Sequence, residues 1–394
     1  LLPVPAIGIG QILANRVTAI CVGEVLHGPL SRCLLLSLVA SSAPDKHEIG
    51  LSLGDTHSIA TTGMITALAD NTDDIHQLCE RLDLGVPKGR VEQVRGGFHH
   101  RMWRLNTQHG GFAVKQLADD MDMQDSATVD RINATEITAQ EFSGRGVPAL
   151  YSLATGRQHL QLIDGRGYLV YPWSEATACG KNSIGKGQAV TVAGLLARIH
   201  RSDIRVPELR DAPALPLTAE RVIDLVQLAR QRNVHESQLL EDRLDDILLA
   251  AELQAPAMEL LAQNQVISHG DLDHKNVLWD EAGAPLIIDW ESARRLNPTY
   301  ELLLEALDWG GITASFETGP FVTFLEAYID AGGRIVSGEV PAVADAIQAS
   351  WVEWMLFNVG RAVGVHDAQQ RAVGLLQVDL SVSTLLRMEK HRPR

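Results

Sequence analysis

Hydrophobic and polar positions follow two different patterns along the chain. Between residues 91 and 117, apolar and polar residues alternate and are broken by glycine pairs, which predicts strands joined by tight turns. From residue 188 onward, apolar residues recur every three or four positions, which predicts helices. The patterns together indicate an α+β protein with a small β-rich N-terminal lobe and a large, mainly helical C-terminal lobe.

The predicted elements can be placed more closely. A turn at Thr107–Gly111 separates two strands, residues 131–142 are predicted as a helix, and RGYLVYPW (166–173) as a further strand. The helices predicted in the second part span 188–200, 218–254, 300–309, 321–330, 341–363 and 368–389.

A helix is also predicted shortly after Met64. Asn71 or Thr72 can cap its first turn, and Gly85 is expected to end it. Its apolar face consists of Ile75, Leu78, Cys79 and Leu82.

Residues 1–63 differ from the rest of the chain. Charged residues are sparse there, and neither helical nor strand periodicity is sustained. We interpret this segment as a poorly structured, dispensable or mistranslated extension, with a small lobe spanning 64–172 and a large lobe spanning 173–394. A chain that begins at Met64 and fails to fold would contradict this interpretation. The apolar run 33–40, followed by SSA, is short and lacks a basic flank close to the start of the chain, so we do not interpret it as a signal peptide.

Composition narrows the classes of function. The chain has 394 residues, 45% of them hydrophobic, and a net charge of −15. This charge disfavours nucleic acid as a partner and is compatible with a cationic ligand, although many cytoplasmic proteins are simply acidic. Four scattered cysteines show no disulfide or metal-like spacing and favour a reducing, cytoplasmic setting. No apolar run is long enough to span a membrane.

Polar residues concentrate in the segment HGDLDHKN (269–276). A short predicted strand at 266–268 leads into it, and strands at 276–280 and 285–290 follow around a tight turn. The ends of these strands carry Asp271, Asn276 and Asp289.

These three side chains form a set that suits phosphoryl transfer. The reaction requires an acceptor for the hydroxyl proton and Mg²⁺ to neutralise the phosphate oxygens. Amide and carboxylate oxygens such as those of Asn276 and Asp289 are suitable Mg²⁺ ligands.

The segment HGDLDHKN followed by IDWE (288–291) resembles the aminoglycoside phosphotransferase/choline kinase-like family, relatives of the protein kinases. The resemblance implies a bilobal protein-kinase-like fold that uses ATP and Mg²⁺. It also implies that Asp271 is the catalytic base, that Asn276 and Asp289 bind Mg²⁺, and that His269 braces the loop.

Upstream segments follow the same order as in that family. RGGFHH, with Gly96 and Gly97, resembles the loop that covers the phosphates, and Lys115 in FAVKQL matches the strand lysine that holds the α- and β-phosphates. The resemblance implies Glu136 as the ion-pair partner of this lysine, with Glu141 as a rival.

The next matching segments are the predicted linker and the helix after it. LVYPW (169–173), with Val170 and Tyr171, resembles the linker whose backbone binds adenine. GLLARIH (194–200) matches a helix that follows this linker, and we interpret His200 within it as a structural core histidine.

Two positions depart from the family pattern. Asp273 stands where relatives often have histidine, and a carboxylate there repels phosphate unless a cation offsets it. It could instead face a cationic acceptor, or the trio Asp273, His274 and Lys275 could be a solvated polar loop. The acidic residue expected after the metal aspartate is Glu301, for which a purely structural role is the alternative.

The predicted function is ATP-dependent phosphorylation of a hydroxyl on a small molecule, such as an aminoglycoside or another cationic or sugar-like compound. A metabolite kinase of the choline, homoserine or sugar-amine type is the closest alternative. A catalytically inactive nucleotide-binding regulator is disfavoured because Lys115, Asp271, Asn276 and Asp289 are all present. A metallohydrolase using His269, Asp271 and Asp289 is disfavoured because further histidine ligands at suitable spacing are absent.

Overall fold

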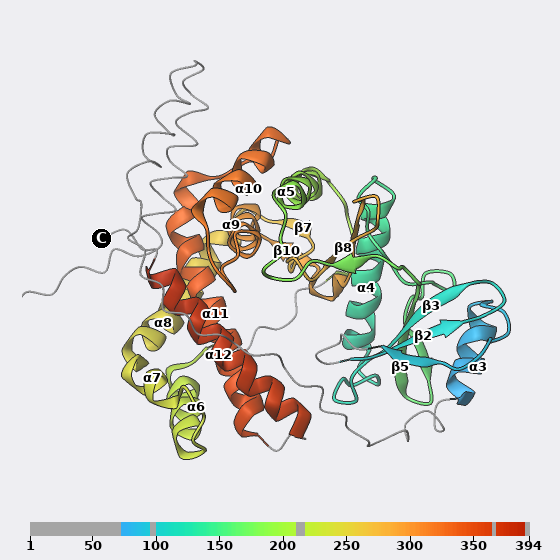
Figure 1. Ribbon diagram of the computed structural model, residues 1–394, viewed down its shortest axis with the longest axis horizontal. Helices are drawn as coiled ribbons and strands as arrows, with labels where there is room; N and C mark the ends of the chain where they lie inside the picture. The colour runs from blue at the N-terminus through green and yellow to red at the C-terminus, as the bar shows by residue number, and fades with distance from the viewer. Residues whose placement is uncertain (1–71, 95–99, 210–216, 365–367, 391–394) are drawn as a thin grey trace, which may run out of the picture.

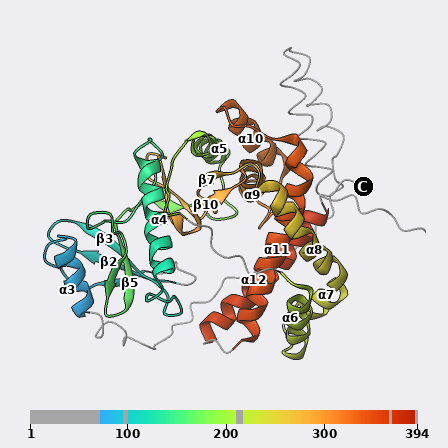
Figure 2. The same ribbon diagram turned by 180° about the vertical axis from the view of Figure 1, so that it is seen from behind.

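The computed structural model describes residues 72–94, 100–209, 217–364 and 368–390. The predicted extension 1–63 and the glycine pair Gly96-Gly97 lie outside these ranges. Within them, a β-rich lobe and a larger helical lobe lie at opposite ends of the molecule (Figures 1 and 2). This arrangement agrees with the two patterns seen in the sequence.

The small lobe is built on a five-stranded antiparallel sheet in the order β1-β2-β3-β5-β4. The strand bounds are Glu92–Val94 (β1), Arg101–Asn106 (β2), Gly111–Gln116 (β3), Gln161–Ile163 (β4) and Arg166–Pro172 (β5). The turn predicted at Thr107–Gly111 is present between β2 and β3, where Asn106 pairs with Gly111. The strand prediction for this lobe is therefore confirmed, and β4 is an addition to it.

Helix α3 (Thr72–Arg81) packs on one face of the sheet. Its apolar face is buried as predicted, together with alternate residues of the strands: Ile75, Leu78, Cys79, Trp103, Leu105, Val114, Tyr168 and Val170. The helix ends at Arg81, earlier than predicted, because the chain already turns at Asp83, which has φ 50°. Gly85, with φ +78°, lies in the connection that follows.

Helix α4 (Ser126–Ser143) lies between the sheet and the large lobe (Figure 1). Asp125 caps it by accepting hydrogen bonds from the backbone N–H groups of Ala127 and Thr128. At its far end, Phe142 stacks on Trp290 of the large lobe, with ring centroids 5.3 Å apart. The helix therefore connects the packing of the two lobes.

The large lobe is dominated by helices, as predicted. Their bounds are Lys186–Arg201 (α5), Ala219–Gln231 (α6), Ser237–Asp242 (α7), Leu244–Leu261 (α8), Pro298–Trp309 (α9), Thr318–Asp330 (α10), Val340–Val363 (α11) and Ala368–Lys390 (α12). Helices α6, α7 and α8 lie at the end remote from the sheet of the small lobe (Figures 1 and 2). The predicted helical stretch 218–254 contains α6, α7 and the first part of α8.

Short strands carry the polar segment 269–276. Strand β7 (Val266–Ser268) pairs with β10 (Arg294–Leu296), and β8 (Val277–Trp279) lies between β6 (Thr177–Ala178) and β9 (Pro285–Ile287). The last predicted strand was expected to reach residue 290, but β9 ends at Ile287. Asp289 has a left-handed backbone, with φ 60° and ψ 59°, and the 3₁₀ turn Trp290–Ser292 follows.

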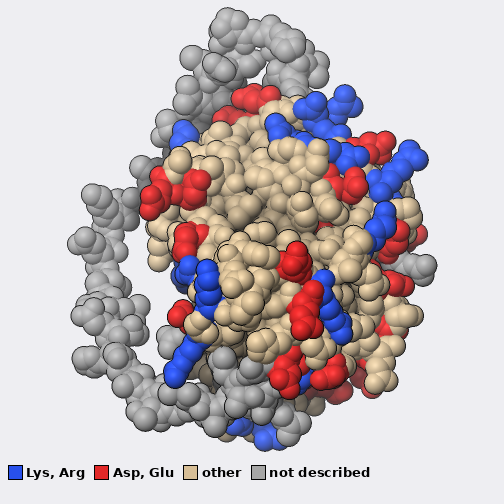
Figure 3. Space-filling model, turned by 90° about the vertical axis from the view of Figure 1, so that its right-hand side faces the viewer, with Lys and Arg blue, Asp and Glu red and all other residues tan. Residues whose placement is uncertain are grey.

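Charges of both signs share the face of the molecule seen in Figure 3. Basic and acidic side chains stand next to one another on the visible described part of this face, with areas of uncharged side chains between them. No helix among the described residues has the length and apolarity needed to cross a membrane.

Candidate active site

The segment HGD lies directly after β7 and takes a shape that requires glycine at its centre. Gly270 has φ +81°, a region that other residues rarely adopt. A Cβ atom at this position would collide with the carbonyl oxygen of Ser292 and with the guanidinium group of Arg294. The close approach of these groups therefore explains the glycine between His269 and Asp271.

His269 is fully buried and fixed by both ring nitrogens. Its Nε2–H donates to the carbonyl oxygen of Ile288 at 3.0 Å, and Nδ1 accepts from the backbone N–H of Asp271 at 3.3 Å. Burial lowers the pKa of His269, which favours the neutral tautomer that these two bonds require. The ring thus links the HGD segment to the strand end that precedes Asp289.

Asp271 and Asn276 are joined across the loop. The Nδ2 group of Asn276 donates to the backbone oxygen of Asp271 at 2.8 Å and to its Oδ2 atom at 3.0 Å. This assignment leaves the amide oxygen of Asn276 available for another ligand. Crowding by protein atoms, and then the charge of Asp273, raise the pKa of Asp271 to about 7, although the residue keeps contact with solvent.

Helix α9 holds the same loop through three carboxyl groups. The backbone N–H of Gly270 donates to Glu301 at 2.6 Å, that of Leu272 to Glu305 at 2.9 Å, and that of His274 to Asp308 at 2.9 Å. The acceptors are four and three residues apart, so they share one face of the helix. In addition, the indole N–H of Trp309 donates to the carbonyl oxygen of Leu272 at 3.0 Å.

The three carboxyl groups of α9 differ in their surroundings. Burial favours the neutral form of Glu301, but its hydrogen bond with His200, at 2.6 Å, outweighs burial and lowers the pKa of the carboxyl. Glu305 is buried, and burial followed by the charge of Asp271 raises its pKa well above the ordinary value. Asp308 forms an ion pair with His274, with 2.8 Å between Oδ2 and Nδ1.

Lys115 connects the small lobe to the end of β9. Its Nζ atom lies 2.8 Å from Asp289 Oδ1 and 2.8 Å from Glu291 Oε2, and Nε2 of His100 lies 3.1 Å from the same Glu291 oxygen. Burial alone would lower the pKa of Lys115, but the two carboxylates outweigh it and raise the pKa above its ordinary value. The lysine is therefore charged and shared between two acids.

The sequence profile of the phosphotransferase enzyme family matches residues 90–346. The chain belongs to this family. No curated protein sequence matches the chain, so the family is established by the profile.

Solved structures with the same fold include other phosphotransferases. Spectinomycin phosphotransferase in complex with ADP and spectinomycin has 14% sequence identity and a TM-score of 0.57, over 80% of this chain and 98% of that one. Choline kinase LicA from Streptococcus pneumoniae has 19% identity and a TM-score of 0.53, over 80% and 99% of the two chains. The predicted bilobal kinase-like fold and the prediction of a phosphotransferase are confirmed.

In this phosphotransferase, four of the nine predicted site residues lie together: Lys115, Asp271, Asn276 and Asp289. Asp271 and Asn276 share a loop and a hydrogen bond, and Asp289 meets Lys115 from the other lobe. Gly96 and Gly97, predicted to cover the phosphates, lie outside the described residues. His200 is a buried core residue as predicted, bonded to Glu301 and Tyr328.

The predicted ion pair between Lys115 and Glu136 is corrected by the structure. Glu136 is buried, and its two carboxylate oxygens accept from the backbone N–H of Ser152 at 2.7 Å and from the hydroxyl of Tyr171 at 2.6 Å. With both oxygens bonded elsewhere, Lys115 pairs with acids of the large lobe instead. The rival, Glu141, forms an exposed pair with Arg145.

Val170 also has a different environment from the one expected. Its side chain is buried in the packing of α3 against the sheet, and its carbonyl oxygen accepts from the backbone N–H of Leu153 at 2.7 Å. That carbonyl is therefore already bonded within the lobe. Tyr171, the next residue, directs its hydroxyl to Glu136.

Four residues of the site were not assigned a role from the sequence. Glu291 is the last residue of the IDWE motif, and His100 is the last residue of RGGFHH. Both therefore belong to motifs that resemble the family. Glu305 and Asp308 follow Glu301 at helical spacing in the otherwise apolar segment ELLLEALDW. An acidic face on a buried helix was the signal that could have identified them.

The structure also gives partners to the polar residues of undecided role. Lys275 Nζ lies 2.6 Å from Asp273 Oδ2, and the backbone N–H of Lys275 donates to Oδ1 of the same carboxylate at 2.8 Å. With His274 paired to Asp308, each charge in this part of the loop has a neighbour of opposite sign.

Proposed function

We propose that this phosphotransferase transfers the γ-phosphoryl group of ATP to a hydroxyl of a small molecule. The observation that carries the proposal is the joint placement of Asp271 and Asn276 on one braced loop, beside the contact between Asp289 and Lys115. Nucleotide use is supported by the related folds, which were solved with ADP for spectinomycin phosphotransferase and with AMP for choline kinase LicA.

In this proposal, Asp271 accepts the hydroxyl proton. Its carboxylate is held by Asn276 on one side, while its backbone N–H is held by His269. Its raised pKa brings it close to neutral pH, where a general base is most effective. Asp271 therefore orients the acceptor hydroxyl and takes its proton as the phosphoryl group is transferred.

The donor set at the end of β9 fits Mg²⁺. The free amide oxygen of Asn276 and the carboxylate of Asp289 are hard oxygen ligands, and few protein ligands are needed because phosphates and waters complete the coordination. Mg²⁺, when bound, neutralises the phosphate oxygens. Lys115 lies beside these ligands and is placed to bind phosphate oxygens as well.

A cationic acceptor is supported by the charge around the loop. Asp273 and Asp308 are paired with Lys275 and His274, whereas Asp271 faces solvent at the loop and the whole chain carries a net charge of −15. An aminoglycoside-like antibiotic and an amine-bearing metabolite both satisfy this condition.

The deciding experiment is a nucleotide-consumption screen of purified protein against hydroxylated antibiotics and amine-bearing metabolites. Mass spectrometry would then locate the added phosphate on any acceptor. The Asp271→Asn variant serves as the control for background hydrolysis. Nucleotide binding without turnover on any acceptor would support an inactive regulator instead.

We also propose a cytoplasmic location. The reaction needs ATP, and the described cysteines, Cys79 and Cys179, both carry free thiols, as expected in a reducing compartment. Fractionation of the native host cell, with detection by antibody, would test this location.

A further inference from the structure

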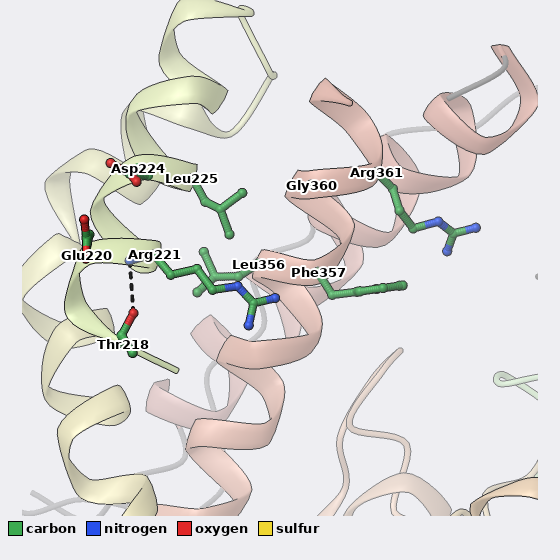
Figure 4. A pocket seen from close by; sticks show the side chains of 9 residues that line it. All are labelled: Thr218, Glu220, Arg221, Asp224, Leu225, Leu356, Phe357, Gly360 and Arg361. Carbon is green, nitrogen blue, oxygen red and sulfur yellow. Dashed lines mark hydrogen bonds between the residues drawn. The ribbon is translucent and has the colours of Figure 1, made fainter. Parts of the chain in front are cut away.

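A cavity of about 570 Å³ lies between helices α6 and α11 of the large lobe. Its wall includes Arg221 and Leu225 from α6, and Leu356, Phe357, Gly360 and Arg361 from α11 (Figure 4). No lining residue belongs to the loop 269–276 or to the small lobe. The cavity is therefore separate from the site described above, and its size is within the range of small-molecule sites.

The side of the cavity formed by α6 combines a positive charge with an apolar surface. Arg221 and Leu225 project from α6 toward α11, whereas Glu220 and Asp224 point away from it (Figure 4). The helix begins at Thr218, whose hydroxyl accepts from the backbone N–H of Arg221 at 3.3 Å. Glu220 and Asp224 also line the cavity, at its edge, and Arg221 is the charged group of α6 that is directed toward α11.

Arg221 is half-buried, and within the described part of the chain its guanidinium group forms no ion pair. A half-buried guanidinium group has lost part of its hydration and gains from an acceptor. Its five N–H donors lie in one plane, so that they can bind two oxygens of an acid group at once. The group recognised here is therefore an anion.

The side formed by α11 offers an aromatic surface. Phe357 is 47% exposed and stacks on Trp354, with ring centroids 5.6 Å apart and planes 20° from parallel. The guanidinium group of Arg361 lies 5.7 Å from the centre of the Phe357 ring, but it is buried, donates to Asn358 and Gln370, and points away from α6 (Figure 4). Large exposed aromatic rings on an otherwise buried helix mark a surface that binds something.

Gly360 keeps the cavity open. A Cβ atom at this position would meet only one atom within 4 Å, Cδ2 of Leu225 at 3.9 Å. A Cβ atom is therefore accommodated at van der Waals distance, and we expect a longer side chain to extend into the space between the two helices. This position therefore permits a test in which the cavity is blocked and the fold is kept.

We propose that the cavity between α6 and α11 binds an organic anion with a flat apolar body, its acid group on Arg221 and its rings against Phe357. We infer this class of ligand because one cation, Arg221, and one exposed aromatic ring, Phe357, line the same cavity. The chain as a whole is strongly acidic. The proposal does not depend on the acceptor or on the proposed phosphoryl transfer.

Two fluorescent probes with the same aromatic body test the proposal on the full-length protein. 8-Anilinonaphthalene-1-sulfonate carries one sulfonate, and N-phenyl-1-naphthylamine lacks it. We expect saturable binding of the sulfonate in the presence of excess ADP, and weaker binding of the neutral probe. In Arg221→Ala, affinity for the sulfonate should fall by about tenfold or more, with little change for the neutral probe.

Matched variants separate the cavity from general effects of charge and folding. Arg232→Ala removes an exposed arginine at the end of the same helix and should leave both affinities unchanged. Gly360→Leu should abolish binding of both probes while the circular dichroism spectrum and the melting temperature stay near those of the wild type. Equal affinity for the two probes, sulfonate binding that survives Arg221→Ala, or binding that ADP displaces would each overturn the proposal.

Discussion

The ammonium group of Lys115 lies 2.8 Å from Asp289 Oδ1, a contact between residues 174 positions apart in the chain. It joins strand β3 of the small lobe to the end of β9 in the large lobe. Asp289, which is predicted to bind Mg²⁺, thus already has a cation beside it. Glu291 forms an ion pair with the same lysine. In the proposed mechanism, binding of Mg·ATP at this site would redistribute charge between Lys115 and Mg²⁺.

Replacing Lys115 with methionine tests this relationship. Without the lysine, Asp289 and Glu291 repel each other, so the free energy of unfolding should fall by about 1 kcal/mol, a value reduced by the partial exposure of both acids. Mg²⁺ should restore more stability to Lys115→Met than to the wild type. Thermal unfolding with and without Mg²⁺ measures this difference, and an equal response of the two proteins would contradict it.

Asp271→Asn tests the proposed base. Asparagine keeps the shape of the side chain and cannot accept the hydroxyl proton, so kcat should fall by about 10²- to 10⁴-fold. The Kd of Mg·ATP should stay within about twofold of the wild-type value, because the nucleotide contacts are on other residues. Steady-state kinetics and calorimetric titration measure the two quantities. Normal turnover in this variant would remove Asp271 from the role of base.

Two substitutions at Asp289 distinguish the effect of its charge from the effect of its backbone conformation. Asparagine tolerates the left-handed conformation with φ 60°, whereas alanine does not, at a cost of about 1 kcal/mol. Both variants should require far more Mg²⁺ for half-maximal activity. Only Asp289→Ala should also melt at a lower temperature than Lys115→Met, which shares the loss of the ion pair. A wild-type Mg²⁺ dependence in Asp289→Asn would exclude the metal role.

Glu305 provides a test of the support that α9 gives to the loop. Because burial raises the pKa of its carboxyl group well above the ordinary value, the site favours a neutral side chain. Glutamine should therefore replace it with less than about twofold loss of kcat while still accepting from the N–H of Leu272. Leucine leaves that buried N–H without an acceptor and should cost about 1–3 kcal/mol of stability. Chemical unfolding measures the stability of the two variants, and steady-state kinetics measures their kcat. Equal behaviour of Gln and Leu would show that the hydrogen bond is unimportant.

The pH dependence of the reaction should report the surroundings of Asp271. As pH falls through about 7, Asp271 takes up a proton and can no longer act as a base, so kcat/KM should decline on the acid side. Asp273→Asn removes a neighbouring negative charge and should shift this decline to lower pH. Lys275→Gln removes a positive charge that lowers the pKa and should shift it to higher pH. Shifts in the same direction would refute the electrostatic explanation.

The sequence was most informative where function depends on residues close together in the chain. Asp271 and Asn276 are five positions apart, and the strands around them follow from local alternation, so their joint placement could be predicted. The partner of Lys115 could not, because it depends on how closely the two lobes approach. Glu136 was assigned by analogy, and its two hydrogen bonds with Ser152 and Tyr171 had no signal in the sequence.

Details of the strand backbone account for two other differences between the predicted and the observed structure. Val170 and Tyr171 are neighbours on one strand, so their side chains face opposite sides of the sheet, and only the packing against α3 shows which side is which. The predicted strand continued to residue 290, three residues beyond the observed end of β9. The alternation of apolar residues gives no indication of the left-handed backbone at Asp289.

The contacts between α9 and the loop also bear on how the loop could change during evolution. Four residues of a helix advance about 6 Å, and two residues of extended chain advance about 6.6 Å, so Glu301 and Glu305 are spaced to meet alternate N–H groups. One inserted residue would turn the remaining N–H groups to the opposite side. The segment from Gly270 to Asn276 can therefore accept new side chains between its fixed ends, whereas its number of residues is held constant by the neighbouring helix.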